Sequence, residues 1–170
     1  MPSSDQLLEY LVATLLSGAG KTTTISILTG MLTQTGGDAL ISGKSIRTEM
    51  SAIRASLGIC PQFDVLWPTM TVKEHLMLYA AFAGMPAAMV KEAVEAAVAE
   101  VALSEKLNYL TGKLSGGQKR KLSLAISFIG RPAVVFLDEP TSGMDPYSRR
   151  FTWEVSSLPY ETQNPFPLNP

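Results

Sequence analysis

The sequence is poor in the residues that stabilise secreted proteins and build soft-metal sites. It has one cysteine, Cys60, in 170 residues. A single cysteine excludes an internal disulfide framework and any cysteine-built metal site. The composition therefore favours a reducing compartment, and the cytosol is the default expectation.

Charge and long apolar runs are also scarce. Charged residues make up 17% of the chain, and 14 basic residues against 15 acidic ones leave a net charge of −1. Without a net positive field, the chain is not expected to bind nucleic acid or an anionic membrane through global charge. No apolar run reaches the roughly 20 residues that span a bilayer, so we expect no transmembrane segment.

Short apolar runs that predict strands alternate with stretches of helical periodicity. The runs cover residues 11–16, 39–41, 57–60 and 134–137, and the last is typical of a strand buried on both faces of a parallel sheet. Helices are expected to begin near residues 21, 71, 86, 115 and 145. Ile25, Leu28 and Leu32 mark the first of them. This alternation predicts an α/β fold with a parallel sheet.

The pattern divides the chain into four parts. Residues 1–64 form the first part of the core, and residues 65–113 form a helical insertion. Residues 114–155 return to the core, and residues 156–170 are a Pro-rich tail that we expect to be unstructured. Within the insertion, valines at 90, 94, 98 and 101 recur on one face of a helix, and we expect this face to pack on its own subdomain.

A glycine-rich turn joins the first predicted strand to the first predicted helix. Glycine amides can surround phosphate oxygens, and the helix N-terminus adds partial positive charge. The candidate nucleotide-binding residues are Gly18, Ala19, Gly20, Lys21, Thr22 and Thr23. Lys21 would neutralise the β- and γ-phosphates, and the Thr22 hydroxyl could bind Mg²⁺. The turn predicts ATP or GTP as ligand, although Leu15 stands where this motif has its first glycine, so we expect an altered loop entrance.

Two adjacent carboxylates follow the most apolar predicted strand. Asp138 and Glu139 would lie at the carboxyl edge of the sheet, where open α/β sheets bind ligands. Asp138 is expected to hold Mg²⁺ through water, and Glu139 is expected to act as general base on the attacking water. The alternative is a pair of solvated loop carboxylates.

A third motif predicts a second anion site. Its residues are Leu114, Ser115, Gly116, Gly117 and Gln118, at the start of a predicted helix. A serine hydroxyl and bare glycine amides at a helix N-terminus suit a phosphate group. Because Lys21 already provides one phosphate contact, this site is best explained by a nucleotide held by a second copy. We therefore expect a dimer with composite sites.

Taken in order, GAGKTT, Gln62, LSGGQ, VVFLDEP and SGMD resemble the nucleotide-binding domain of ATP-binding cassette (ABC) transporters over roughly residues 11–154. The sequence segments around these motifs are similar to those of the eukaryotic A subfamily, which moves lipids. These segments are CPQFDVLWPTMTVKEHL and DEPTSGMDPYSRR. The resemblance implies a P-loop NTPase core with an inserted helical subdomain, using ATP and Mg²⁺ at the cytoplasmic face of a membrane. It also implies two partners, the transmembrane domains of a transporter and a second nucleotide-binding domain.

The resemblance assigns roles to individual positions. Residues 21–23 would contact phosphate and Mg²⁺. Gln62, catalytic together with Glu139, would link the Mg²⁺ site to the membrane domain. Residues 115–118 would face the γ-phosphate on the opposite subunit, and Asp145 would cross the dimer interface.

Two departures from the family pattern leave other functions open. No upstream aromatic is placed to stack on adenine, and the only histidine, His75, lies on a predicted helix far from the position of the family's switch histidine. We expect His75 to be a surface or packing residue, and both outer ends of the core to be altered or lost. One alternative is a truncated cassette that binds nucleotide weakly without turnover. The other, a chromosome-maintenance type ATPase, is disfavoured because no sustained heptads separate Gln62 from the LSGGQ motif.

Overall fold

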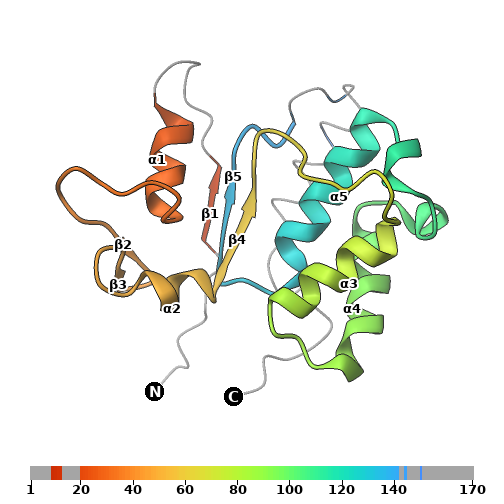
Figure 1. Cartoon of the computed structure of the whole chain (residues 1–170), viewed down its shortest axis with the longest axis horizontal. Helices are drawn as coiled ribbons and strands as arrows, with labels where there is room; N and C mark the ends of the chain where they lie inside the picture. The colour runs from red at the N-terminus through yellow and green to blue at the C-terminus, as the bar shows by residue number, and fades with distance from the viewer. Residues whose placement is uncertain (1–8, 13–19, 142–143, 145–149, 151–170) are drawn as a thin grey trace.

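Helices pack on both faces of a short parallel sheet, so the fold is mixed α/β (Figure 1). The computed structural model describes residues 9–12, 20–141, 144 and 150. The elements, in chain order, are β1 (Glu9–Val12), α1 (Lys21–Leu28), β2 (Leu40–Ile41), β3 (Lys44–Ser45), α2 (Met50–Arg54), β4 (Leu57–Cys60), α3 (Val72–Phe82), α4 (Ala87–Glu100), the 3₁₀ helices η1 (Ser104–Lys106) and η2 (Thr111–Lys113), α5 (Gly116–Ile129) and β5 (Val134–Leu137).

Strand β5 lies between β1 and β4 and is parallel to both. Its last residue, Leu137, is opposite Val12 of β1 and Cys60 of β4. All four β5 residues are buried, as the apolar run predicts for a strand covered on both faces. Because the strands are parallel, their carboxyl ends lie at one edge of the sheet.

The side chains of β5 alternate between the two helical layers. Val134 and Phe136 pack in one cluster with residues of α1 and α2, whereas Val135 and Leu137 pack with residues of α5. Figure 1 shows α1 and α2 on one side of the sheet and α5, with α3 and α4 beyond it, on the other. β2 and β3 form a separate two-stranded antiparallel sheet.

Helices α3, α4 and α5 share one apolar cluster. The predicted start of α3 is confirmed: the Thr71 hydroxyl oxygen accepts a hydrogen bond from the backbone N–H of Glu74, and the Glu74 carboxylate accepts one from the backbone N–H of Thr71. Val94 and Val98 are buried as their spacing predicts. Because α5 belongs to the same cluster, a separate subdomain at 65–113 stays a prediction.

The first helix ends earlier than expected. α1 stops at Leu28, and Leu32, which was expected on its apolar face, is 50% exposed. Gly30 adopts a left-handed conformation with φ of 72°, and the N–H groups of Met31 and Leu32 turn back to the carbonyl of Ser26. A glycine of this kind terminates a helix. The predicted strand at 39–41 is the shorter β2, and the pattern missed β3 and α2.

Several expectations concern residues that the structure does not describe. They include strand residues 13–16, the altered entrance at Leu15, most of the helix after Asp145, and the tail at 156–170. Within the part of the chain that is described, no helix has the length and apolarity needed to span a bilayer.

Gly58 provides a test of the packing between β4 and α5. A Cβ atom here would collide with the backbone oxygen of Ser127 and lie 2.8 Å from Cγ of Pro132. We expect Gly58→Ala to lower the free energy of unfolding by about 1–3 kcal/mol, because α5 would have to move away from the sheet.

Urea unfolding followed by circular dichroism measures this change. Gly36→Ala is the control, since a Cβ there would meet no atom within 4 Å, and it should change the free energy by less than about 0.5 kcal/mol. Equal stability of Gly58→Ala and the unmodified protein would refute the tight packing.

Candidate functional site

Five of the predicted site residues converge at the carboxyl edge of the sheet. Lys21 and Thr22 begin α1, Gln62 follows β4, and Asp138 and Glu139 follow β5. Open α/β sheets bind their ligands at this edge. The fold thus brings together residues from three segments that are far apart in the sequence.

Thr22 and Asp138 meet directly. The Thr22 hydroxyl donates a hydrogen bond of 2.9 Å to Oδ2 of Asp138. Asp138 is only 4% exposed, and its other carboxylate oxygen, Oδ1, is buried with no hydrogen-bond partner. A buried carboxylate oxygen without a partner is unfavourable unless a cation or water satisfies it.

The donor types at this pair fit Mg²⁺. A hydroxyl and a carboxylate are hard oxygen donors, and Mg²⁺ commonly uses one or two protein carboxylates together with phosphate and water oxygens. Among the described residues, no group of three or more His, Cys, Asp or Glu side chains forms a self-sufficient metal site. Phosphate and water oxygens could complete the coordination of a cation here.

Glu139 lies between two of the other candidates. Its Oε1 is 3.6 Å from Nζ of Lys21, and its Oε2 accepts a hydrogen bond of 3.3 Å from Nε2 of Gln62. The Lys21 side chain is 7% exposed and that of Glu139 is 37% exposed. The Glu139 carboxylate thus supplies the counter-charge of the nearly buried Lys21 ammonium. An entering phosphate could take the place of that carboxylate.

Gly20 shapes the start of α1. It has φ of 79°, a left-handed conformation that favours glycine, and its carbonyl accepts hydrogen bonds from the backbone N–H and the hydroxyl of Thr24. Thr23 is exposed. Gly18 and Ala19, the first half of the predicted phosphate loop, lie outside the described residues.

The LSGGQ motif (residues 114–118, hereafter the signature turn) begins α5 as predicted. The Ser115 hydroxyl oxygen accepts a hydrogen bond from the Gln118 N–H, and the Gln118 side-chain oxygen accepts one from the Ser115 N–H. Ser115 and Gly116 are exposed, and a Cβ on Gly116 would meet no atom within 4 Å. Contact of this turn with a second nucleotide stays a prediction, and Asp145 lies outside the described residues.

Comparison with known proteins shows the family to which this sequence belongs. Residues 16–142 match the ABC transporter family. This chain belongs to the ABC transporter family. It is 53% identical over 141 residues to ABC transporter A family member 2 of Arabidopsis thaliana. The aligned residues make up 82% of this chain and 14% of that protein.

Relatives from distant organisms carry A-subfamily names as well, which confirms the predicted resemblance. ABC transporter A family member 6 of Dictyostelium discoideum is 50% identical over 138 residues, 81% of this chain and 8% of its own length. The human retinal-specific phospholipid-transporting ATPase ABCA4 is 49% identical over 139 residues, 82% of this chain and 6% of its own length. This ABC chain therefore spans a small fraction of these relatives.

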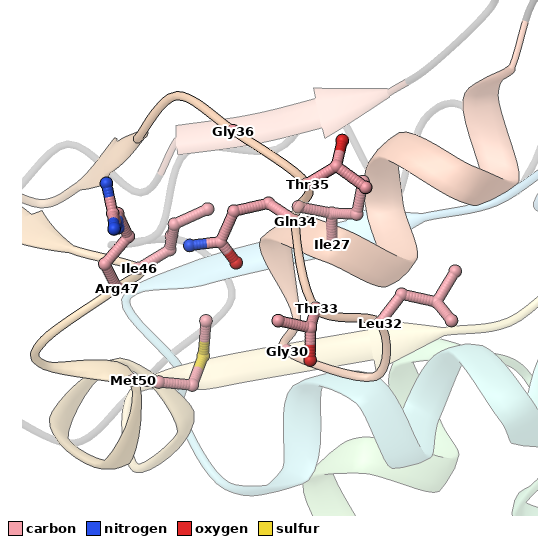
Figure 2. A pocket seen from close by; sticks show the side chains of 10 residues that line it. All are labelled: Ile27, Gly30, Leu32, Thr33, Gln34, Thr35, Gly36, Ile46, Arg47 and Met50. Carbon is pink, nitrogen blue, oxygen red and sulfur yellow. The ribbon is translucent and has the colours of Figure 1, made fainter.

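A pocket of about 370 Å³ lies away from the carboxyl edge, at the far end of α1 from Lys21. Figure 2 shows Ile27 at that end of the helix, with Gln34, Ile46, Arg47 and Met50 around the hollow. None of the predicted site residues lines it. This pocket is therefore separate from the candidate site at the sheet edge.

One further residue, absent from the predicted set, lies at the candidate site. Arg120, two residues after the signature turn, is 3% exposed and donates hydrogen bonds to backbone carbonyls on the loops after β4 and β5. Backbone acceptors leave no mark in the sequence, and the run QKRK is typical of a charged helix surface. No sequence signal identified this residue.

His75 is a packing residue, one of the two roles expected for it. It is fully buried, its Nε2 accepts a hydrogen bond from the Trp67 N–H, and its Nδ1 lies 2.9 Å from the Thr71 carbonyl oxygen. Since that carbonyl can only accept, the proton belongs on Nδ1. These bonds fix the loop before α3.

Cys60, two residues before Gln62, reports on the integrity of the same edge. It is fully buried, and burial raises the pKa of its thiol from 9.0 to about 11. The thiolate is the reactive form, so the native thiol should react with iodoacetamide at pH 8 at least about 100-fold more slowly than the urea-unfolded chain. Mass spectrometry of quenched samples measures the rates.

The sign of the pH dependence follows from the direction of this shift. Because the folded-state pKa lies above the unfolded one, the contribution of Cys60 to the free energy of unfolding is lost as pH rises from about 9 to about 11. Equally fast labelling of native and unfolded protein at pH 8 would contradict the burial of Cys60.

Proposed function

We propose that this ABC family member binds Mg·ATP at the carboxyl edge of its sheet and hydrolyses it when paired with a second nucleotide-binding domain. The observation that carries the proposal is the convergence of Lys21, Thr22, Gln62, Asp138 and Glu139 from three separate segments. Solvated carboxylates, the alternative for 138 and 139, do not account for a 4% exposed Asp138 bonded to Thr22.

Binding uses the start of α1. The amides of residues 18–23 and the helix N-terminus would surround the phosphates, and Lys21 would neutralise them. Thr22, Asp138 and Gln62 would hold Mg²⁺, which supplies charge neutralisation to the phosphate oxygens. The unpartnered Oδ1 of Asp138 supports this placement, because it is a buried acceptor in need of a positive partner.

Hydrolysis uses Glu139. When the phosphates take Lys21 as their partner, the Glu139 carboxylate loses its ion pair and becomes available to a water molecule, still oriented by the Gln62 amide. The water oxygen attacks the γ-phosphorus, the bond to ADP breaks, and the water proton passes to Glu139 as general base.

The second nucleotide-binding domain would complete the site. Ser115, Gly116, Gly117 and Gln118 of one copy would face the γ-phosphate bound to the other, and Asp145 would cross the interface. The exposure of Ser115 and the open space over Gly116 support this role, since a docking partner can reach the positive end of α5.

The cycle would drive transport. The human relative is named as a phospholipid-transporting ATPase, and we propose lipids as the substrate class here. The domain would act at the cytoplasmic face of a membrane against the transmembrane domains of an ABC transporter, with the helical segment at 65–113 receiving them.

Binding of Mg·ATP without turnover is the second candidate. The observation behind it is that His75 is fully buried and uses both ring nitrogens in bonds to the chain. It cannot serve as the family's switch histidine.

Glu139→Gln separates binding from chemistry. The amide keeps the size of the side chain but cannot act as a base, so we expect Mg·ATP turnover to fall by about 10²–10⁴-fold with binding retained. Phosphate release and isothermal titration calorimetry measure the two quantities. Lys21→Ala is the contrasting variant and should lose binding.

Each result has a distinct meaning. Turnover of the unmodified protein that survives Glu139→Gln would remove Glu139 from the mechanism. Binding by the unmodified protein with no phosphate release would favour the second candidate.

A further inference from the structure

The guanidinium of Arg120 is buried with an acceptor for every N–H group. Nε donates to the Pro140 carbonyl, Nη1 to the carbonyls of Pro61 and Gln62, and Nη2 to the carbonyls of Asp138 and Glu139. Arginine has five such donors, in a rigid planar fork. One side chain thus binds the loop after β4 and the loop after β5 together.

We propose that Arg120 is a positioning residue. It fixes the position of Gln62 relative to Glu139 and connects both residues to the signature turn. The proposal rests on the proposed function for its effect on turnover. Its structural basis is separate: Arg120 lies in the second turn of the helix that the signature turn begins, so a displacement of that helix would move both loops.

The backbone of Glu139 gives a second reason for this role. Glu139 has φ of 47°, a left-handed conformation that is unfavourable for a residue with a Cβ. Nη2 of Arg120 donates to the carbonyl of Asp138, which precedes that strained residue, and to the carbonyl of Glu139 itself, at 2.9 Å each. The hydrogen bonds therefore stabilise a conformation that the chain would otherwise leave, and this conformation directs the Glu139 carboxylate toward Lys21 and Gln62.

Asp64 and Ser123 fix the guanidinium itself. Oδ1 of Asp64 is 3.4 Å from Nη1 of Arg120 and accepts a hydrogen bond of 2.8 Å from the Ser123 hydroxyl. A nearly buried cation is strongly disfavoured without a counter-charge, and Asp64 supplies it. Because Asp64 lies on the loop after β4, the same ion pair also anchors that loop to α5.

Arg120→Lys tests the proposal in the full chain. Lysine keeps the charge but has three donors on a flexible stem, so it cannot hold both loops. We expect kcat for Mg·ATP hydrolysis to fall by about 100-fold while KM changes by less than about threefold, because catalytic groups become misplaced while phosphate contacts remain.

Arg54→Lys is the matched control. Arg54 also donates to backbone carbonyls, those of Thr29 and Gly30, but at the far end of α1. We expect its kcat to stay within about threefold of the unmodified protein. An equal loss in both variants would overturn the proposal in favour of a general effect of losing an arginine.

Hydrogen exchange tests the positioning role without turnover. The Asp138 N–H donates to the Cys60 carbonyl, where the two loops begin. In nucleotide-free protein we expect this amide to exchange at least about tenfold faster in Arg120→Lys and unchanged in Arg54→Lys. Unchanged exchange in Arg120→Lys would overturn the proposal. If the unmodified protein lacks turnover, the proposed function fails, and exchange alone decides the role of Arg120.

Asp64→Asn provides a variant that keeps the arginine, should Arg120→Lys not fold. It removes the counter-charge and leaves the five carbonyl acceptors, so we expect an intermediate loss of kcat, about tenfold, and faster exchange at the Asp138 amide. If both kcat and the exchange rate of the Asp138 amide equal those of the unmodified protein, the proposal is overturned.

Discussion

The parallel pairing of β5 with both of its neighbours is the constraint on which the candidate site depends. Every residue of β5 is buried, and Leu137 lies in register with Cys60, so the chains leaving β4 and β5 start side by side. The bond from the Asp138 N–H to the Cys60 carbonyl extends the pairing beyond the strand. Without this register, Gln62 and Glu139 would not share a hydrogen bond. The site is therefore a product of the sheet and not of its loops alone.

Most polar groups at this edge pair with one another, but Asp138 does so only in part. Lys21 and Glu139 form an ion pair, and the Thr22 hydroxyl satisfies one oxygen of Asp138. The remaining oxygen of Asp138 is buried without a partner. Both features are consistent with the proposed ligand. A triphosphate would compete with Glu139 for Lys21, and a divalent cation would be a partner for the unpaired oxygen of Asp138. One Mg·ATP would bring both groups at once.

The sequence was informative where the physical cause is local. An apolar run predicts β5, the capping box at Thr71 predicts the start of α3, and the Ser-Gly-Gly-Gln run predicts the start of α5, because the side chains that make these elements are close in sequence. The parallel sheet predicts Asp138 and Glu139 at its carboxyl edge, whereas Gln62 was assigned to the site only through the family resemblance. β3 and α2 were missed because such short elements depend on tertiary contacts. Arg120 was missed because its acceptors are main-chain carbonyls, which any sequence provides.

Arg120 also changes what the signature turn can do. A helix start that only faced a partner's nucleotide could move without consequence for its own copy. Here Arg120, in the second turn of the same helix, binds the carbonyls of Asp138 and Glu139, and Glu139 is in a strained conformation. Strained backbone persists only while its surroundings hold it. In the proposed dimer, a shift of the signature turn would therefore reach the backbone of Glu139 through Arg120.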